Sequence, residues 1–282
     1  MSSVDSALDL LKATSRTFFI PISLLPAGLQ EAVASAYLCM RAIDQIEDHA
    51  EMDLRLKARL LRQLSLNLQG GTEGSTPNDF ARGLETASTR LEEVTLRIGE
   101  WALLAPETIA PRIWDATAAM ADRMAYWAER NWLIEDECDL DRYSFSVAGS
   151  VGLMLSDLWA WHDGTQTSRT QAIGFGRGLQ SINILRNHAE DMTRGVDFYP
   201  TGWTDADMHR YAKRNLALAD AYVAALPKGP ALAFCEIPLA LARGTLEALS
   251  KGQEKLSRGD VMAIVGQLTK GKISGKIAQI VR

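Results

Sequence analysis

The sequence predicts an all-α fold, and three features support this prediction. Apolar residues recur with helical spacing through most of the 282 residues. A sustained alternation of apolar and polar residues bounded by turns, which would indicate a sheet, is not found. Helix-breaking residues divide the pattern into intervals that are long enough for substantial helices.

Segments rich in proline and glycine mark the predicted ends of these helices. The breaks fall at Pro21 and Pro26, at residues 70–77, at Pro106 and Pro111, at residues 162–168, at residues 195–202 and at residues 227–230. The loop at 70–77 is the best candidate for a linker. We nevertheless expect one helical domain over residues 1–282, because acidic helical segments lie on both sides of this loop and must meet to share a ligand.

The composition is that of an ordinary globular protein, with 47% hydrophobic and 23% charged residues. A net charge of −5 argues against nucleic-acid binding, because a broad basic surface is missing. The three cysteines are widely separated, which indicates neither a disulfide framework nor a zinc site. The sequence has no run near the roughly 20 apolar residues that span a bilayer, and its N-terminus lacks signal-peptide features. We therefore expect a soluble, cytoplasmic protein.

The stretch at 269–282 is basic and carries alternating apolar residues. Such a segment could touch an anionic membrane from which a lipid substrate is taken, so any membrane contact is expected to be peripheral. The alternative is a solvated terminal helix.

Two segments, 41–48 and 180–191, place oxygen-bearing side chains every four residues within a helical pattern. These are Asp44 and Asp48 in the first segment, and Asn183, Asn187 and Asp191 in the second. This spacing puts the side chains on one face of each helix. Oxygen ligands without a Cys or His cluster favour Mg²⁺, which completes its coordination with water and substrate phosphates. Two such faces could hold a diphosphate between them, in the interior of a helical bundle.

Simpler explanations exist for each feature. An isolated acidic run is usually a solvated surface, and Arg41 could form only a helical ion pair with Asp44. His49 and His188 adjoin the two segments, but a lone histidine there is more often a neighbour than a metal ligand.

Four motifs in the same order resemble the squalene/phytoene synthase family, and the likeness extends from near the N-terminus to beyond residue 240. They are Ser15-Arg-Thr-Phe18, the aspartate motif at 41–48, Tyr143-Ser-Phe-Ser-Val-Ala-Gly-Ser-Val-Gly152 and the second aspartate motif at 180–191. The resemblance implies an isoprenoid-synthase helical fold with a central cavity. It also implies Mg²⁺-dependent ionisation of an allylic prenyl diphosphate.

The resemblance further implies a role for each matching position. The Mg²⁺ ligands would be Asp44, Asp48, Asn183 and Asp191, with Asn187 beside them in the second motif. Arg41, Arg186, Arg16 and Thr17 would contact the diphosphate, and Tyr143 and Gln180 would lie near the reacting groups. Val147, Ala148, Val151 and Gly152 would line the channel for the prenyl chain.

Two departures from the family pattern influence the predicted reaction. Asn187 stands where the family has Asp, so one ligand brings no charge. The segment 196–199 replaces one that often contains Arg followed by Tyr. These losses favour a simpler reaction than joining two prenyl diphosphates, namely transfer of one prenyl group to an aromatic acceptor such as a carbazole.

Four tryptophans near the third motif could stack such an acceptor, or they could be core residues; they are Trp127, Trp132, Trp159 and Trp161. Three other functions stay open. The acceptor could be a second prenyl diphosphate, as in squalene or phytoene formation. Water could capture the cation, which would make the protein a prenyl-diphosphate phosphatase. The chain could also be a scaffold that binds a lipid diphosphate without turnover.

Overall fold

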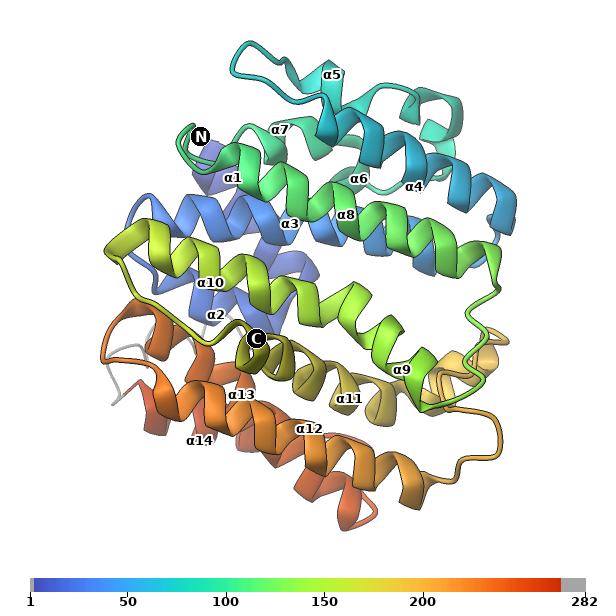
Figure 1. The fold of residues 1–282 in the computed structure, drawn as a ribbon, viewed down its shortest axis with the longest axis vertical. Helices are drawn as coiled ribbons and strands as arrows, with labels where there is room; N and C mark the ends of the chain where they lie inside the picture. The colour runs from blue at the N-terminus through green and yellow to red at the C-terminus, as the bar shows by residue number, and fades with distance from the viewer. Residues whose placement is uncertain (1–2, 270–282) are drawn as a thin grey trace.

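The computed structural model describes residues 3–269, apart from the side chain of Arg16. Within these residues every regular element is a helix, which confirms the predicted all-α class (Figure 1). The N-terminal half contains α1 (Ser3–Thr14), α2 (Arg16–Ser23), α3 (Leu29–Asp48), α4 (Leu54–Gln69), α5 (Pro77–Ala81), a 3₁₀ helix η1 (Leu84–Arg90), α6 (Glu93–Leu96), α7 (Ile98–Ala102) and α8 (Ala110–Glu129). The C-terminal half contains α9 (Glu137–Ser144), a π-helical turn η2 (Phe145–Gly149), α10 (Ser150–Asp163), α11 (Arg169–Thr193), α12 (Asp205–Ala225), α13 (Pro230–Ser250) and α14 (Arg258–Leu268).

Most of the predicted breaks fall between helices, but the prolines behave differently from one another. Pro111 and Pro230 lie in the first turns of α8 and α13, where a missing N–H leaves no helical bond unmade. Pro21 was expected to end a helix, yet it lies inside the short helix α2, two residues before its last residue, Ser23. Pro238 lies inside α13, which continues through it.

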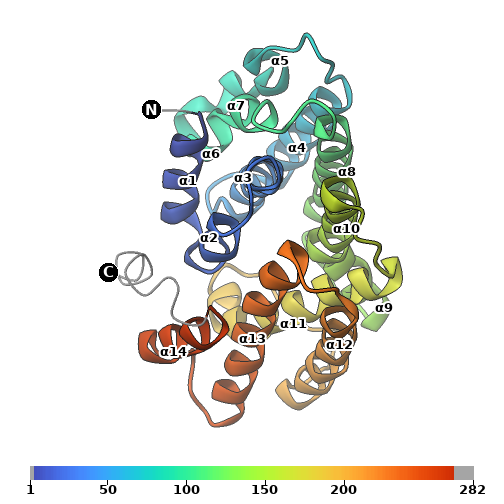
Figure 2. The ribbon, with the colours of Figure 1, turned by 90° about the vertical axis from the view of Figure 1, so that its left-hand side faces the viewer.

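One hydrophobic cluster extends from α1 to α13. It includes residues on both sides of the loop at 70–77, such as Leu68 and Phe80. The loop therefore separates helices that share a core, as the prediction of one helical domain requires. Figure 2 views α3 nearly along its axis, with α2, α4, α8 and α10 around it, which explains why so much of α3 is buried.

The crossing of α10 with α11 depends on two glycines. A Cβ atom at Gly152 would overlap the carbonyl oxygen of Ala172, and one at Gly176 would overlap that of Ala148. Only glycine permits backbones to approach so closely. The η2 turn and α10 are thereby pressed against α11, which fixes the position of the second aspartate motif.

The described helices include none that is long and apolar enough to cross a membrane. Residues 270–282 of the predicted membrane-contacting stretch lie outside the described residues.

Candidate active site

The last turns of α3 and α11 meet, and an arginine joins them. Asp48 is the final residue of α3, and Asp191 lies in the last turn of α11. Arg194, which follows α11, donates from Nη1 to Asp48 Oδ1 at 2.7 Å and from Nη2 to Asp191 Oδ1 at 2.5 Å. Helix C-termini carry partial negative charge, so two of them and these carboxylates together make a site that favours cations.

Glu47 lies beneath this junction rather than on a solvated face, with 8% of its surface exposed. Its Oε1 accepts hydrogen bonds from Trp132 Nε1 at 2.9 Å and from the Tyr143 hydroxyl at 3.4 Å. Lys57 Nζ donates to the backbone carbonyl of Glu47 at 2.5 Å and lies 5.0 Å from the centre of the Trp132 ring. The first motif is therefore anchored from α4, α9 and the loop after α8.

Two carboxyl groups of the first motif, those of Asp44 and Glu47, resist ionisation. Burial raises the pKa of Asp44 to about 7; Arg41 opposes this shift and Asp48 adds to it. Burial also raises the pKa of Glu47 well above its usual value, and Asp48 and Asp44 raise it further. The Asp44 side chain nevertheless keeps 36% of its surface accessible. The Asp44 carboxyl group can therefore be reached by a cation, and a bound cation would offset the repulsion between the neighbouring carboxylates.

In the second motif, burial raises the pKa of Asp191, and hydrogen bonding to Arg194 opposes that shift. Burial lowers the pKa of Arg194, but its bonds to Asp48 and Asp191 outweigh this and raise the pKa overall. The guanidinium thus stays charged between the two carboxylates.

Tyr143 belongs to an aromatic cluster next to the carboxylates. Its ring stacks on Phe198 with centres 4.5 Å apart, and Trp127 meets it edge-on at 5.6 Å. Burial raises the pKa of Tyr143 well above its usual value, and the charges of Glu47 and Asp48 raise it further. The phenol therefore stays neutral and can donate a hydrogen bond.

The other predicted ligands lie along α11. Asn183 donates from its amide to Gln180 Oε1 at 3.4 Å, and Asn187 Oδ1 accepts from Arg186 Nε at 3.1 Å. Among residues 3–269 there is no ready group of three or more Asp, Glu, His or Cys side chains placed to hold a metal ion. The donor set nevertheless fits Mg²⁺ chemically, because all of its atoms are oxygens and a cation already binds two of the carboxylates. The individual ligand assignments stay predictions.

The predicted diphosphate-binding residues have varied surroundings. Arg41 forms a loose ion pair with Asp44, at 4.0 Å between Nη1 and Oδ2. Thr17 is exposed near the start of α2, whereas the side chain of Arg16 lies outside the described part of the chain. The rings of Phe18 and Tyr37 have centres 5.7 Å apart, which places α2 against α3.

The predicted channel residues divide into two groups. Val147, Ala148 and Val151 are half-buried on η2 and α10. Gly152 is buried, and the position of its absent side chain faces the backbone of α11, so its visible role is close packing. A role beside a prenyl chain stays a prediction for all four.

Sequence reasoning did not identify Arg194 and Lys57 as site residues. Arg194 follows Asp191 by three residues, a spacing that puts both on one side of a helix end. Nothing in the sequence pointed to Lys57, because its partner is a backbone carbonyl. Trp132 was expected to be either a stacking platform or a core residue; it is buried, and its indole also supports Glu47.

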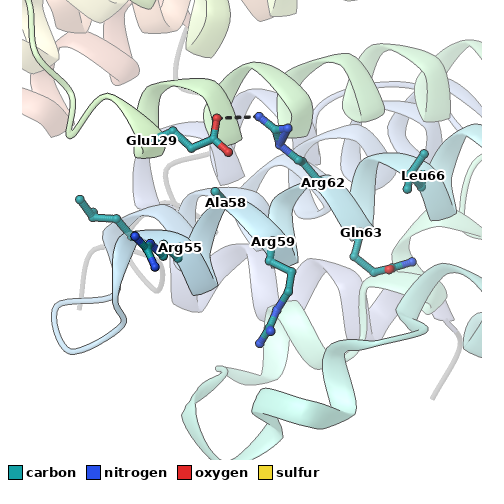
Figure 3. Close-up of a pocket in the computed structure, with 8 residues that line it drawn as sticks. Arg55, Ala58, Arg59, Arg62, Gln63, Leu66 and Glu129 are labelled. Carbon is teal, nitrogen blue, oxygen red and sulfur yellow. Dashed lines mark hydrogen bonds and ion pairs between the residues drawn. The ribbon is translucent and has the colours of Figure 1, made fainter.

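A separate hollow of about 720 Å³ lies on the surface between α4 and α8 (Figure 3). Arg55, Arg59 and Arg62 border it, and Arg62 pairs with Glu129 at 2.7 Å. None of the predicted site residues lines it.

Comparison with known proteins places the chain in a family. The model of the squalene/phytoene synthase family matches residues 11–207. Squalene synthase of Schizosaccharomyces pombe is 30% identical over 91% of this chain and 63% of its own length. Squalene synthase of Dictyostelium discoideum is 29% identical over 85% of this chain and 62% of its own. The chain thus spans just under two thirds of the length of these two relatives.

Solved structures show the same fold. A complex of TcSQS with the ligand E5700 has a TM-score of 0.74 and 21% identity, covering 99% of this chain and 96% of its own. A dehydrosqualene synthase in complex with a ligand has a TM-score of 0.64 and 20% identity, covering 96% of this chain and 97% of its own. With the family model matching four consecutive motifs and the helices superposing along nearly the whole chain, the protein belongs to the squalene/phytoene synthase family.

Proposed function

We propose that the protein is a Mg²⁺-dependent prenyltransferase that joins two prenyl diphosphates. The observation that supports this most directly is the meeting of the two aspartate motifs, where Asp48 and Asp191 bind one cationic group. The relatives named above are squalene synthases, which favours a second prenyl diphosphate as the acceptor.

The expected transfer to an aromatic acceptor has less support. Trp127 and Trp159 are 2% and 1% exposed, so they are core residues. The Trp132 indole is bonded to Glu47, and that of Trp161 is bonded to Thr108 Oγ1 at 3.1 Å. Of these four tryptophans, three are therefore buried core residues, and Trp161 alone keeps a partly exposed ring.

Bound Mg²⁺ would neutralise the charge that develops on the diphosphate as the carbon–oxygen bond breaks. Asp44, Asp48 and Asp191 would hold it, with amide oxygens from Asn183 and Asn187. Arg41 and Arg186 would orient the same leaving group through charge-assisted hydrogen bonds. The diphosphate departs with the electron pair of the broken bond and leaves an allylic cation.

The chain's own aromatic side chains suit that cation. Tyr143 and Phe198 stack on each other beside the carboxylates and would form a dry wall that limits capture of the cation by water. The double bond of the second prenyl chain would then attack the cation, forming a carbon–carbon bond with loss of a proton.

Product analysis tests this proposal. The protein is incubated with Mg²⁺ and farnesyl or geranylgeranyl diphosphate alone, and in parallel with indole, carbazole and naphthalene-diol acceptors. A C30 or C40 product from diphosphate alone is expected.

Other outcomes would replace the proposal. A prenylated aromatic compound formed only with an added acceptor would establish aromatic transfer. Prenyl alcohol as the sole product would indicate a phosphatase. Binding of Mg²⁺ and a thiolodiphosphate, without turnover of any diphosphate, would indicate a scaffold.

A further inference from the structure

We propose that Arg194 is a diphosphate-binding residue, which Asp48 and Asp191 hold between the two aspartate motifs until a metal ion takes their oxygens. This inference rests on the proposed function and adds a residue to its binding machinery.

The bridge uses two different nitrogens of one guanidinium. Nη1 binds Asp48 at the end of α3, and Nη2 binds Asp191 at the end of α11. The Asp191 side chain is 8% exposed, whereas that of Arg194 is 33% exposed. Arg194 therefore extends from the solvent-accessible side of the junction to a nearly buried carboxylate.

The same two carboxylates are the predicted metal ligands from the two motifs. Positive charges a few ångströms apart repel each other, so a divalent cation and the guanidinium compete for these oxygens. Metal binding would therefore free the guanidinium at the mouth of the site, where the incoming ligand is a polyanion.

Arginine is chemically suited to that ligand, because its planar fork matches phosphate oxygens in a bidentate manner. Arg194 lies in the loop after α11 and beside both carboxylates, where it would meet a diphosphate bound through a metal ion.

The charge balance of the site points the same way. Asn187 is a neutral member of the second motif, and Arg194 brings one positive charge beside Asp191. The second motif of this chain thus contributes cationic and amide donors to an anion, while the first motif contributes most of the carboxylates.

The test compares Arg194→Met and Arg194→Lys with the parent protein. Arg82→Met is the matched control. Arg82 follows the short helix α5 and pairs with Asp79, three residues earlier, at 2.9 Å, just as Arg194 follows α11 and pairs with Asp191. Calorimetric titration measures Mg²⁺ binding to the metal-free protein, then inorganic pyrophosphate binding at saturating Mg²⁺. Melting temperatures check folding.

Arg194→Met is expected to bind Mg²⁺ more tightly, by about threefold to tenfold, since the competing cation is gone. It is expected to bind pyrophosphate more weakly by at least about tenfold, because a charge-assisted pair of hydrogen bonds is lost. Arg194→Lys should keep a Mg²⁺ affinity near that of the parent and lose about threefold in pyrophosphate affinity. Arg82→Met should change neither affinity.

A purely structural arginine would not shift the two affinities in opposite directions. Unchanged pyrophosphate binding in folded Arg194→Met would overturn the inference, and so would weaker Mg²⁺ binding. If Arg194→Met does not fold, unchanged pyrophosphate affinity in Arg194→Lys would overturn the inference instead. Failure of the parent protein to bind pyrophosphate with Mg²⁺ would instead count against the proposed function itself.

Discussion

The two aspartate motifs face each other across one site, yet they are built differently. The first contains three carboxyl groups, and Trp132 and Tyr143 bond to its buried Glu47. The second contains two, the exposed Glu190 and the nearly buried Asp191, which pairs with Arg194. Negative charge is thus concentrated on α3, while α11 offers amides and positive charge.

The two helices therefore need not contribute equally to metal binding. A crowded carboxylate cluster holds cations strongly because its members repel one another until a cation arrives. A single buried carboxylate with amide neighbours holds a cation less strongly but tolerates the approach of an anion.

The largest effect is expected from Asp48→Ala. Loss of this carboxylate should lower kcat for any accepted prenyl diphosphate by at least about a thousandfold, because charge stabilisation of the leaving group depends on it. Asp191→Ala should lower kcat less. Steady-state kinetics at saturating Mg²⁺ measure both, with Asp122→Ala on the exposed face of α8 as the control. Equal losses of kcat in Asp48→Ala and Asp191→Ala would show that the two motifs contribute equally.

Trp132→Phe should destabilise the protein by about 1–3 kcal/mol, because the buried carboxyl of Glu47 loses its shorter hydrogen bond. Urea denaturation measures the free energy of unfolding. Trp161→Phe is the comparison, since that indole bonds to Thr108 at a more exposed position. An equal loss in the free energy of unfolding for both variants would mean that the hydrogen bond to Glu47 stabilises the protein no more than an exposed one does.

Asn187→Asp should make the second motif resemble the first. An added carboxylate is expected to increase Mg²⁺ affinity about tenfold, since affinity follows the number of charged ligands. Calorimetric titration measures it, and Asn78→Asp in exposed α5 controls for overall charge. An equal gain from Asn78→Asp would show that position does not matter.

The smallest effect is expected in the pH dependence of metal-free stability. The pKa of Asp44 is raised to about 7 in the folded protein, so the folded state retains a proton that the unfolded state releases near pH 4. Stability from this group is therefore present at low pH and is lost as the pH rises from about 4 through about 7. Solvent access to Asp44 limits the size of the effect.

Thermal denaturation without divalent ions, from roughly pH 5 to pH 8, measures this loss. The melting temperature of Asp44→Asn should change less with pH than that of the parent, and the variant should be the more stable protein near pH 8, because an amide cannot ionise. Parallel curves for the parent and the variant would rule out this origin of the pH dependence.

Much of the fold could be predicted from the sequence because helical periodicity and turn residues are local signals. The all-α class and the helices that bear the two motifs follow from such signals. The core shared across the loop at 70–77 was expected for another reason, because the two acidic helices must meet to share a ligand. Pro21 was misjudged, since a proline in the last turns of a short helix removes few hydrogen bonds.

Helical spacing in the sequence was enough to predict a face of metal ligands on each of two helices, because spacing decides which side chains share a face. The diphosphate-binding residues came from the family resemblance. The burial of Glu47, its support by Trp132 and Lys57, and the bridge from Asp48 through Arg194 to Asp191 are visible only in the folded chain. Burial and these contacts depend on how distant helices pack, in particular on the close approach of α10 and α11 at Gly152 and Gly176, and no local pattern encodes that approach.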